Sequence, residues 1–202
     1  GTQTVKSQLI KVDATLPEEP NTAAVVAKWE KIKMDALSSS GFDANKIVTA
    51  KIKSLDCREV VVRNGACEAG DLLTKAMLKA AKNNPDCALV NSGSIRVDDI
   101  LSAPFTELDI VRMLPFGGAI VEVEMRGSLL RKTLETSLTN KGNGGFLQYQ
   151  NIRYDATGKR WSVNGAALDD AKVYRVILPE FLLSGNEQNM GFLKTAPAAE
   201  GK

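Results

Sequence analysis

A short apolar run that passes directly into a glycine-bearing turn constrains this chain more than any other stretch. Ala88-Leu89-Val90 is followed at once by Asn91-Ser92-Gly93-Ser94-Ile95-Arg96. A brief apolar run bounded by turn residues predicts a buried strand, which places a sheet inside the core. Gly93 has no side chain, so the backbone after this strand can approach a ligand closely. Read alone, the same residues also fit an ordinary strand end followed by a surface turn.

The remaining pattern predicts strands and helices in alternation. Apolar residues at helical spacing predict three longer helices, and β-branched or alternating runs predict strands. The interval 98–113 predicts short helices or turns, and the small polar tail from Thr195 predicts a frayed end. Because the elements interleave without a strict βαβ rhythm, we expect a mixed-sheet domain of the α/β or α+β class. The predicted helices cover residues 22–38 (capped by Asn21), 68–83 and 127–138, and the predicted strands or β-rich runs cover 4–13, 47–53, 60–62, 88–90, 119–125, 152–155, 161–163 and 173–178.

Composition excludes several classes of function. The chain has 202 residues with a formal net charge of +2, which argues against a broad nucleic-acid-binding surface. No apolar run approaches the length that spans a bilayer. The chain contains no histidine, so a Ser-His-Asp or Cys-His device and a histidine-based metal site are all excluded. It starts at Gly1 and not at a methionine, so the lack of a secretory signal at its start says little about compartment.

The three cysteines, Cys57, Cys67 and Cys87, predict little chemistry. An odd number cannot pair completely, and no C-x-x-C spacing indicates zinc. We expect them to be small buried apolar residues, although one disulfide among them remains open.

Candidate binding residues lie where predicted elements end. Arg63 precedes a helix, Arg96 follows the buried strand, and two arginines suit a phosphate or carboxylate because guanidinium binds oxyanions bidentately. Phe116 stands on a Pro/Gly loop and Phe181 follows a strand, so two rings could hold a flat ligand between them. Glu187 is expected to be a solvated loop carboxylate unless another group positions it. Together these residues predict a nucleotide site, although each also fits a surface or core role.

Two other features look like sites but are predicted not to be. The glycine loop, residues 142–145, lacks the Lys-Ser/Thr pair of a Walker phosphate loop and is expected to be a turn. Asp98, Asp99 and Asp109 have no spacing that supports a metal site.

Taken in order, the motifs resemble those of the C-terminal domain of the 5′-nucleotidase family, the group that includes ecto-5′-nucleotidase and periplasmic UDP-sugar hydrolase. The resemblance covers about residues 45–194, and the set of motifs is specific when taken together. The matching stretches are Arg63 to Gly70, Asn91-Ser92-Gly93-Ser94-Ile95-Arg96 (the family's Asn-x-Gly-x-Ile-Arg), Leu114-Pro115-Phe116-Gly117-Gly118, Gly145-Phe146-Leu147-Gln148, and Val176 to Leu182.

This resemblance implies a division of the chain and of the chemistry. It implies a layered α/β/β/α domain over residues 43–202 and, over residues 1–42, the end of a catalytic domain with an interdomain linker helix. In this family a pair of divalent metal ions, zinc or similar, and the catalytic residues lie in an N-terminal metallophosphoesterase domain. The chain would therefore recognise a nucleotide or nucleoside without hydrolysing it. The family is typically exported, which implies a periplasmic, extracellular or cell-surface protein.

The resemblance also implies individual roles. Phe116 and Phe181 would stack on the base, and Asn91, followed by Gly93, would hydrogen-bond it. Arg63 and Arg96 would hold phosphate and ribose oxygens. Glu187 falls where the family usually has an aspartate on the ribose hydroxyls, within an altered run Gly185-Asn186-Glu187-Gln188-Asn189. That departure leaves an alternative open, namely a non-catalytic binding or adhesion module that kept the fold without a working nucleotide pocket.

Overall fold

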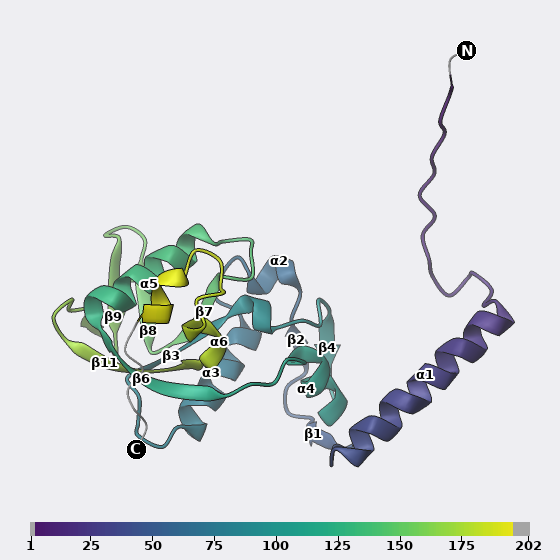
Figure 1. Cartoon of the computed structure of the whole chain (residues 1–202), viewed down its shortest axis with the longest axis horizontal. Coiled ribbons are helices and arrows are strands. Elements are labelled where there is room, and N and C mark those ends of the chain that lie inside the picture. Colours follow the sequence, from purple (N-terminus) through teal and green to yellow (C-terminus); the bar gives the residue numbers. More distant parts are fainter. Residues whose placement is uncertain (1–2, 196–202) are drawn as a thin grey trace. The chain divides into compact units, whose positions relative to one another are not determined.

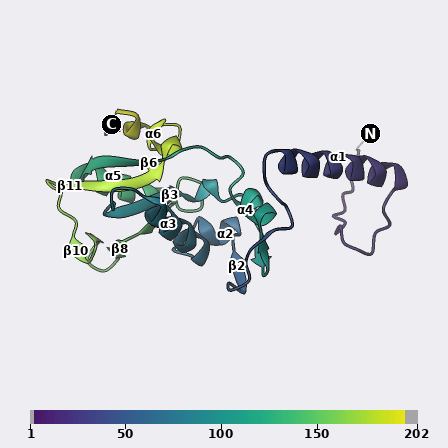
Figure 2. The same cartoon turned by 90° about the horizontal axis from the view of Figure 1, so that it is seen from below.

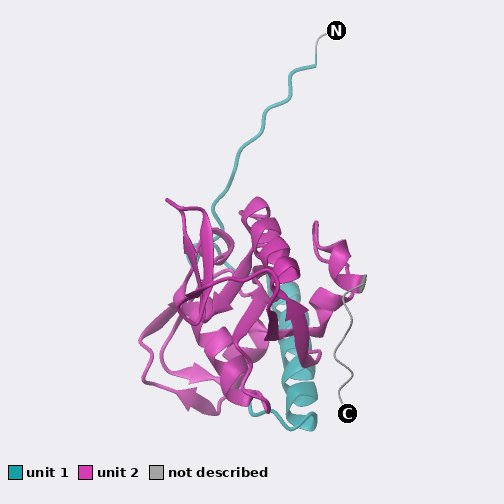
Figure 3. Ribbon diagram, turned by 90° about the vertical axis from the view of Figure 1, so that its left-hand side faces the viewer, with its two compact units in different colours: residues 1–44 teal, residues 45–202 magenta. Residues whose placement is uncertain are grey.

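The computed structural model describes residues 3–195, and the chain divides into two compact units, residues 1–44 and 45–202 (Figure 3). The first unit contains one long helix, α1 (Pro20–Ser39), which confirms the helix predicted for 22–38. Its N-cap is Glu19 and not Asn21. The Glu19 carboxylate accepts hydrogen bonds from the backbone N–H groups of Asn21 (3.0 Å) and Thr22 (2.7 Å), while Pro20 takes the first helical position.

The strand predicted for residues 4–13 is wrong for this structure. Residues 3–12 have no regular secondary structure, and their side chains are exposed. A strand needs a neighbour to satisfy its backbone N–H and C=O groups, and no strand within residues 3–195 pairs with this segment. The alternating pattern and the β-branched residues of this segment favour a strand, but no strand among the described residues pairs with it. The frayed tail that was also predicted falls largely on residues 196–202, which lie outside the described part.

The second unit is built on a four-stranded mixed sheet of order β6-β11-β3-β7. β11 runs parallel to β3 and antiparallel to β6, and β3 runs antiparallel to β7. All five residues of β3 are buried, which confirms the buried strand that was predicted at 88–90. The mixed α/β class is confirmed as well. The strands are β3 (Cys87–Asn91), β6 (Ile120–Arg126), β7 (Leu147–Gln150) and β11 (Val173–Pro179).

Two amphipathic helices cover the faces of this sheet (Figures 1 and 2). α3 (Glu68–Ala80) contributes Met77 to a cluster with alternate strand residues such as Val90. α5 (Gly127–Thr139) packs its leucines into a larger cluster with Leu89 and with the strand residues that point to the opposite face of the sheet. Successive strand residues point to opposite faces, so β3 supplies both clusters. Both helices were predicted from their apolar stripes, although α3 ends before the predicted Asn83.

A second core lies under short elements near the start of this unit. The strand predicted at 47–53 is confirmed only for residues 47–49, because residues 50–53 are irregular and the next strand begins at Ser54. The β-rich run 60–62 is helical. There the carboxylate of Asp98 accepts the backbone N–H of Glu59 (2.8 Å), which caps a helical turn despite three valines in a row. A contact with a distant residue thus overrides β-propensity. The elements are β1 (Ile47–Thr49), β2 (Ser54–Asp56), α2 (Glu59–Val62), β4 (Ile100–Ser102), β5 (Phe105–Thr106) and α4 (Glu107–Met113).

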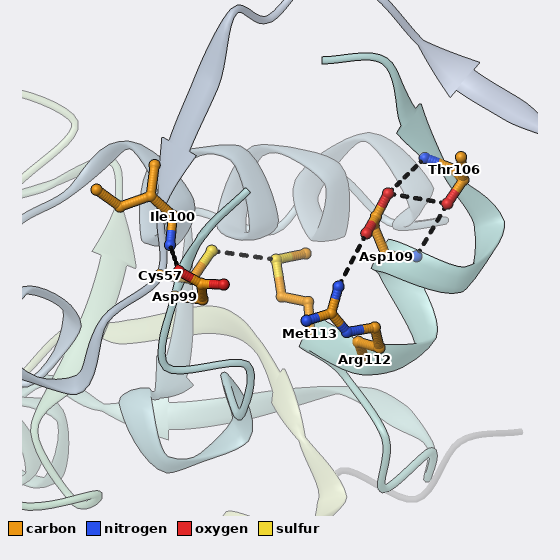
Figure 4. A network of polar contacts seen from close by, with 7 residues as sticks. All are labelled: Cys57, Asp99, Ile100, Thr106, Asp109, Arg112 and Met113. Carbon is orange, nitrogen blue, oxygen red and sulfur yellow. Dashed lines mark hydrogen bonds and ion pairs between the residues drawn. The ribbon is translucent and has the colours of Figure 1, made fainter. Parts of the chain in front are cut away.

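Helix α4 is fixed at its start by a capping box (Figure 4). The hydroxyl of Thr106 accepts the backbone N–H of Asp109 (3.3 Å), and the carboxylate of Asp109 accepts the backbone N–H of Thr106 (2.9 Å). Near its end, Met113 packs its sulfur 3.8 Å from that of buried Cys57. The aspartate is therefore a helix-capping residue.

The rest of the chain completes the core around Trp161. The predicted hairpin is confirmed. The indole of Trp161 contacts the rings of Tyr149 and Tyr154, whose centroids lie 5.8 and 4.5 Å from its own. The Asn164-Gly165 turn has positive φ at both residues (51° and 80°), as a tight hairpin turn requires. The remaining elements are β8 (Ile152–Asp155), β9 (Arg160–Val163), β10 (Ala166–Ala167), α6 (Glu180–Leu183) and the 3₁₀ turns η1 (Ser92–Ser94) and η2 (Gly191–Thr195).

Candidate functional site

Strand pairing brings most of the predicted site residues to one end of the central sheet. Parallel strands β3 and β11 both finish there, and β6 begins there because Pro179 pairs with Ile120. The N–H of Glu180 donates to the carbonyl of Ala119 (2.9 Å), so the segment before β6 lies beside the start of α6. The loop that carries Phe116 and the short helix α6 (Glu180–Leu183) that carries Phe181 therefore leave the same end of the sheet. In open α/β sheets, ligands bind at this end of the sheet, just beyond the carboxyl ends of the parallel strands.

Arg96 lies beside Phe116. The backbone N–H of Arg96 donates to the carbonyl of Met113 (3.0 Å), which ties the turn after β3 to the end of α4. The guanidinium carbon then lies 5.5 Å from the centroid of the Phe116 ring, within the range of a cation–π contact. Phe116 is 70% exposed and Phe181 48%, so both rings retain free faces.

Asn91 and Glu187 are held together by hydrogen bonds. The Asn91 amide Nδ2 donates to Glu187 Oε2 (2.7 Å), and its Oδ1 accepts the hydroxyl of Ser94 (2.8 Å). Glu187 Oε1 accepts the backbone N–H of Gln188 (2.8 Å). Asn91 is only 4% exposed. The loop carboxylate is therefore positioned by its neighbours, and Ser94 takes part by donating its hydroxyl to Asn91.

Gly93 lies against another backbone segment, the glycine loop, while its predicted close approach to a ligand stays a prediction. Its N–H donates to the carbonyl of Gly144 (2.8 Å). A Cβ built at Gly93 would lie 3.1 Å from the Gly144 Cα, tighter than ordinary packing. The turn after β3 thus lies directly against the glycine loop.

Arg63 caps the C-terminal end of α2 and is ion-paired with Glu59 one turn earlier. Its side chain is 17% exposed, and its buried Nε has no hydrogen-bond partner within the described residues. Its backbone contacts the glycine loop, since the carbonyl of Arg63 accepts the N–H of Gly142 (2.8 Å). The guanidinium of Arg63 therefore contacts Glu59, which is not one of the predicted site residues.

Two cavities adjoin this region. The first has a volume of about 190 Å³ and includes Phe116, Ser94 and Pro179 at the same sheet edge. That is below the roughly 300 Å³ at which ligand pockets usually begin, so it would enclose only part of a nucleotide. The second, about 270 Å³, lies in the second core and is lined by apolar side chains and Thr49, which does not suit a polar ligand. The first cavity is lined by Leu73, Met77, Val90, Ser94, Leu114, Phe116, Gly117, Gly118, Ala119, Ile120 and Pro179.

All three cysteines are free, and Cys57 and Cys87 are buried as expected, whereas Cys67 is half-buried. Burial raises the pKa of the Cys57 thiol to about 11 and that of the Cys87 thiol to about 12, which keeps both protonated and unreactive at neutral pH. Within residues 3–195, no group of three or more His, Cys, Asp or Glu side chains is placed to hold a metal ion.

No helix in the described part of the chain is both long enough and apolar enough to cross a membrane.

Comparison with known proteins identifies the family of the chain. A sequence model of the family described as 5′-nucleotidase, C-terminal domain, matches residues 46–195. The chain is 30% identical to the 5′-nucleotidase of Bos taurus, over 88% of this chain and 35% of that protein. It is 27% identical to the snake venom 5′-nucleotidase of Naja atra, over 88% of this chain and 38% of that protein. The solved structure of a 5′-nucleotidase precursor from Thermus thermophilus aligns with a TM-score of 0.71 at 26% identity, over 88% of this chain and 36% of that chain.

The chain therefore belongs to the 5′-nucleotidase C-terminal domain family, and the resemblance seen in its motifs is confirmed. It spans about a third of the length of these relatives.

Two buried amides near the site were not singled out by the sequence reasoning. Asn140 follows the last turn of α5 and is fully buried, and Gln148 on β7 is 2% exposed. Both bond to backbone of segments that carry predicted site residues. Gln148 lies in a stretch that matched the family, so its position could have been noticed. Asn140 stands at a helix end, where asparagine is common, and carried no signal.

Proposed function

We propose that this chain is the nucleotide-recognition part of a 5′-nucleotidase-type phosphohydrolase. The observation that carries the proposal is the arrangement at the end of the central sheet. Phe116, Arg96, Asn91 and Glu187 lie in linked segments there, and Phe181 leaves the same edge. A base would be held by the two rings and the Asn91 amide, and an oxyanion by arginine. The relatives named 5′-nucleotidase support the same ligand class.

The charges at the site favour one orientation of a bound nucleotide, with the sugar hydroxyls near the carboxylate and the phosphate near the arginines. Carboxylates only accept hydrogen bonds, so Glu187 suits the sugar hydroxyls and repels phosphate. Arg63 and Arg96 supply donors and positive charge for the phosphate. Arg63 would exchange its present contact with Glu59 for the ligand.

The experiment that tests this is calorimetric titration of the whole chain with adenosine and with AMP, repeated on Phe181→Ala. We expect saturable binding that weakens in the variant. Because the cavity encloses only part of a ligand, millimolar affinity is expected, about 4 kcal/mol. No heat from a folded chain at millimolar ligand would overturn the proposal.

Hydrolysis is assigned to a part of the protein other than this chain. In the proposed intact protein, residues 1–42 end a catalytic domain and form a linker helix, and residues 43–202 recognise the substrate. A metal pair, zinc or similar, would belong to an N-terminal metallophosphoesterase domain, since the sequence has no histidine and the described residues form no cluster of metal ligands. Incubation with AMP and divalent zinc or manganese should release no phosphate. Release that disappears in Arg96→Ala would contradict this assignment.

One observation favours a second candidate, a binding or adhesion module without a nucleotide pocket. Several polar groups of the site are already paired within the chain, Asn91 with Glu187 and Ser94, and Arg63 with Glu59. A ligand must displace some of these contacts. The titration separates the two candidates, because the module would give no heat with either compound.

Export is part of the proposal. The relative from Naja atra is named as a venom protein, and the family resemblance points to periplasmic, extracellular or cell-surface proteins. We therefore place the parent protein outside the cytoplasm.

A further inference from the structure

The glycine loop contacts two of the segments that carry predicted site residues. The N–H of Gly142 donates to the carbonyl of Arg63 (2.8 Å). The carbonyl of Gly144 accepts the N–H of Gly93 (2.8 Å) and the hydroxyl of Ser92 (3.2 Å). The loop thus joins the arginine segment to the turn after β3, and its backbone sets their separation.

At one end of this connection, the Gln148 amide holds the segment around Arg63. Its Nε2 donates to the carbonyls of Val62 (2.8 Å) and Gly65 (2.7 Å), on either side of the arginine. Its Oε1 accepts the N–H of Cys67 (3.4 Å). Gln148 is 2% exposed, so these bonds replace water that cannot enter.

At the other end, the Asn140 amide holds the loop that carries Glu187. Its Nδ2 donates to the carbonyls of Gln188 (2.8 Å) and Gly145 (3.3 Å), and its Oδ1 accepts the side-chain amide of Asn189 (2.8 Å). Asn140 is fully buried. A Cβ at Gly145 would lie 2.6 Å from Asn140 Nδ2 and 3.0 Å from Glu187 Oε1, so the missing side chain leaves room for both groups.

We propose that Asn140 and Gln148 are positioning residues, each of which holds a different part of this site in place. Gln148 places the cationic end through the segment of Arg63, and Asn140 places the carboxylate end through the loop of Glu187. The inference rests on the proposed function, since it assigns these ends to the phosphate and the sugar hydroxyls. An amide suits both positions because one planar group supplies donors and an acceptor to backbone groups that water cannot reach.

The test measures two ratios of dissociation constants on the full chain. The phosphate ratio compares adenosine with AMP, and the hydroxyl ratio compares 2′,3′-dideoxyadenosine with adenosine. Gln148→Met keeps the side-chain volume and removes the donors. It should lower the phosphate ratio by about threefold or more and leave the hydroxyl ratio unchanged. Asn140→Ala should lower the hydroxyl ratio by about threefold or more and leave the phosphate ratio unchanged.

Second variants address each position if the first does not fold. Gly70→Ala introduces a Cβ that would lie 2.2 Å from Gln148 Oε1, and should act like Gln148→Met. Asn140→Asp keeps the acceptor for Asn189 and removes the donors, and should act like Asn140→Ala.

The matched control is Thr133→Val. Thr133 is fully buried in α5, and among residues 3–195 its hydroxyl donates to the Leu129 carbonyl of its own helix (2.9 Å). It should lower stability and leave both ratios unchanged. If the unmutated chain binds neither adenosine nor AMP, the proposed function fails and this inference fails with it. If the chain binds, but the variants change both ratios together or neither, only the positioning inference is overturned.

Discussion

The two halves of the candidate site are built in opposite ways. The polar half, Asn91 with Ser94 and Glu187, is held by short hydrogen bonds, and Asn91 is nearly buried. The aromatic half, Phe116 and Phe181, projects into solvent with 70% and 48% of its surface exposed. The first half is part of the folded core, whereas the second contributes little to it.

This difference separates the sources of stability and of affinity. Bonds that are already made before binding cost no ordering of side chains when a ligand arrives, so the polar half can select among ligands. Exposed rings gain free energy only when a base covers them. Changes in the polar half should therefore affect folding, and changes in the aromatic half should affect binding alone.

The largest effect on stability is expected from Asn91→Leu. The variant leaves the Glu187 carboxylate and the Ser94 hydroxyl without their partner, which should cost about 2 kcal/mol of unfolding free energy. Urea denaturation measures this. Asn186→Leu, at an exposed position in the same part of the chain, is the control and should change stability by less than about 0.5 kcal/mol. Equal losses in the two variants would mean that the polar half is not part of the core.

Phe181→Ala should weaken AMP binding by about tenfold or more, because stacking of one base on an aromatic ring contributes about 1–3 kcal/mol. Titration calorimetry measures the change. The control is Phe42→Ala, since Phe42 is similarly exposed (45%) and belongs to the other unit. If the two variants bind AMP equally, Phe181 is not a stacking residue.

Phe116→Ala should have a smaller effect on binding, about fivefold to tenfold, and its unfolding free energy should stay within about 1 kcal/mol of the unmutated chain. The variant also removes the ring beside the Arg96 guanidinium, an exposed contact of about 0.5–1 kcal/mol at most. Titration and urea denaturation on the same preparation test both statements. A stability loss as large as that of Asn91→Leu would erase the distinction between the halves.

The smallest effect is expected from Glu59→Gln, which removes the charge that pairs with Arg63. Affinity for AMP should rise by about twofold to threefold, while affinity for adenosine should not change, because only the phosphate meets the released guanidinium. Asp71→Asn, which breaks an ion pair of the same i,i+4 spacing, the more exposed pair with Lys75 on α3, is the control. A gain for adenosine as well would show that Arg63 does not act on the phosphate.

Several elements followed directly from periodicity and composition. The buried strand β3, the long strand β11 and the apolar stripes of α3 and α5 are local patterns that the tertiary structure keeps. The β-rich run at 60–62 did not follow, because Asp98, far away in sequence, caps that segment as a helix. The strand predicted at 4–13 failed for a related reason, since it has no partner in the described part of the chain.

Sequence alone determined the residue types available to the site, the family to which the chain belongs, and the exclusion of histidine chemistry. Only the tertiary structure decided how those residues meet. The register of β6 against β11 brings the loop of Phe116 and the helix of Phe181 to one end of the sheet, and the buried amides of Asn140 and Gln148 connect segments more than 40 residues apart. Helical and strand periods are set by the local backbone. The pairing of a buried donor with a distant carbonyl is set by which groups lose water together when the chain folds.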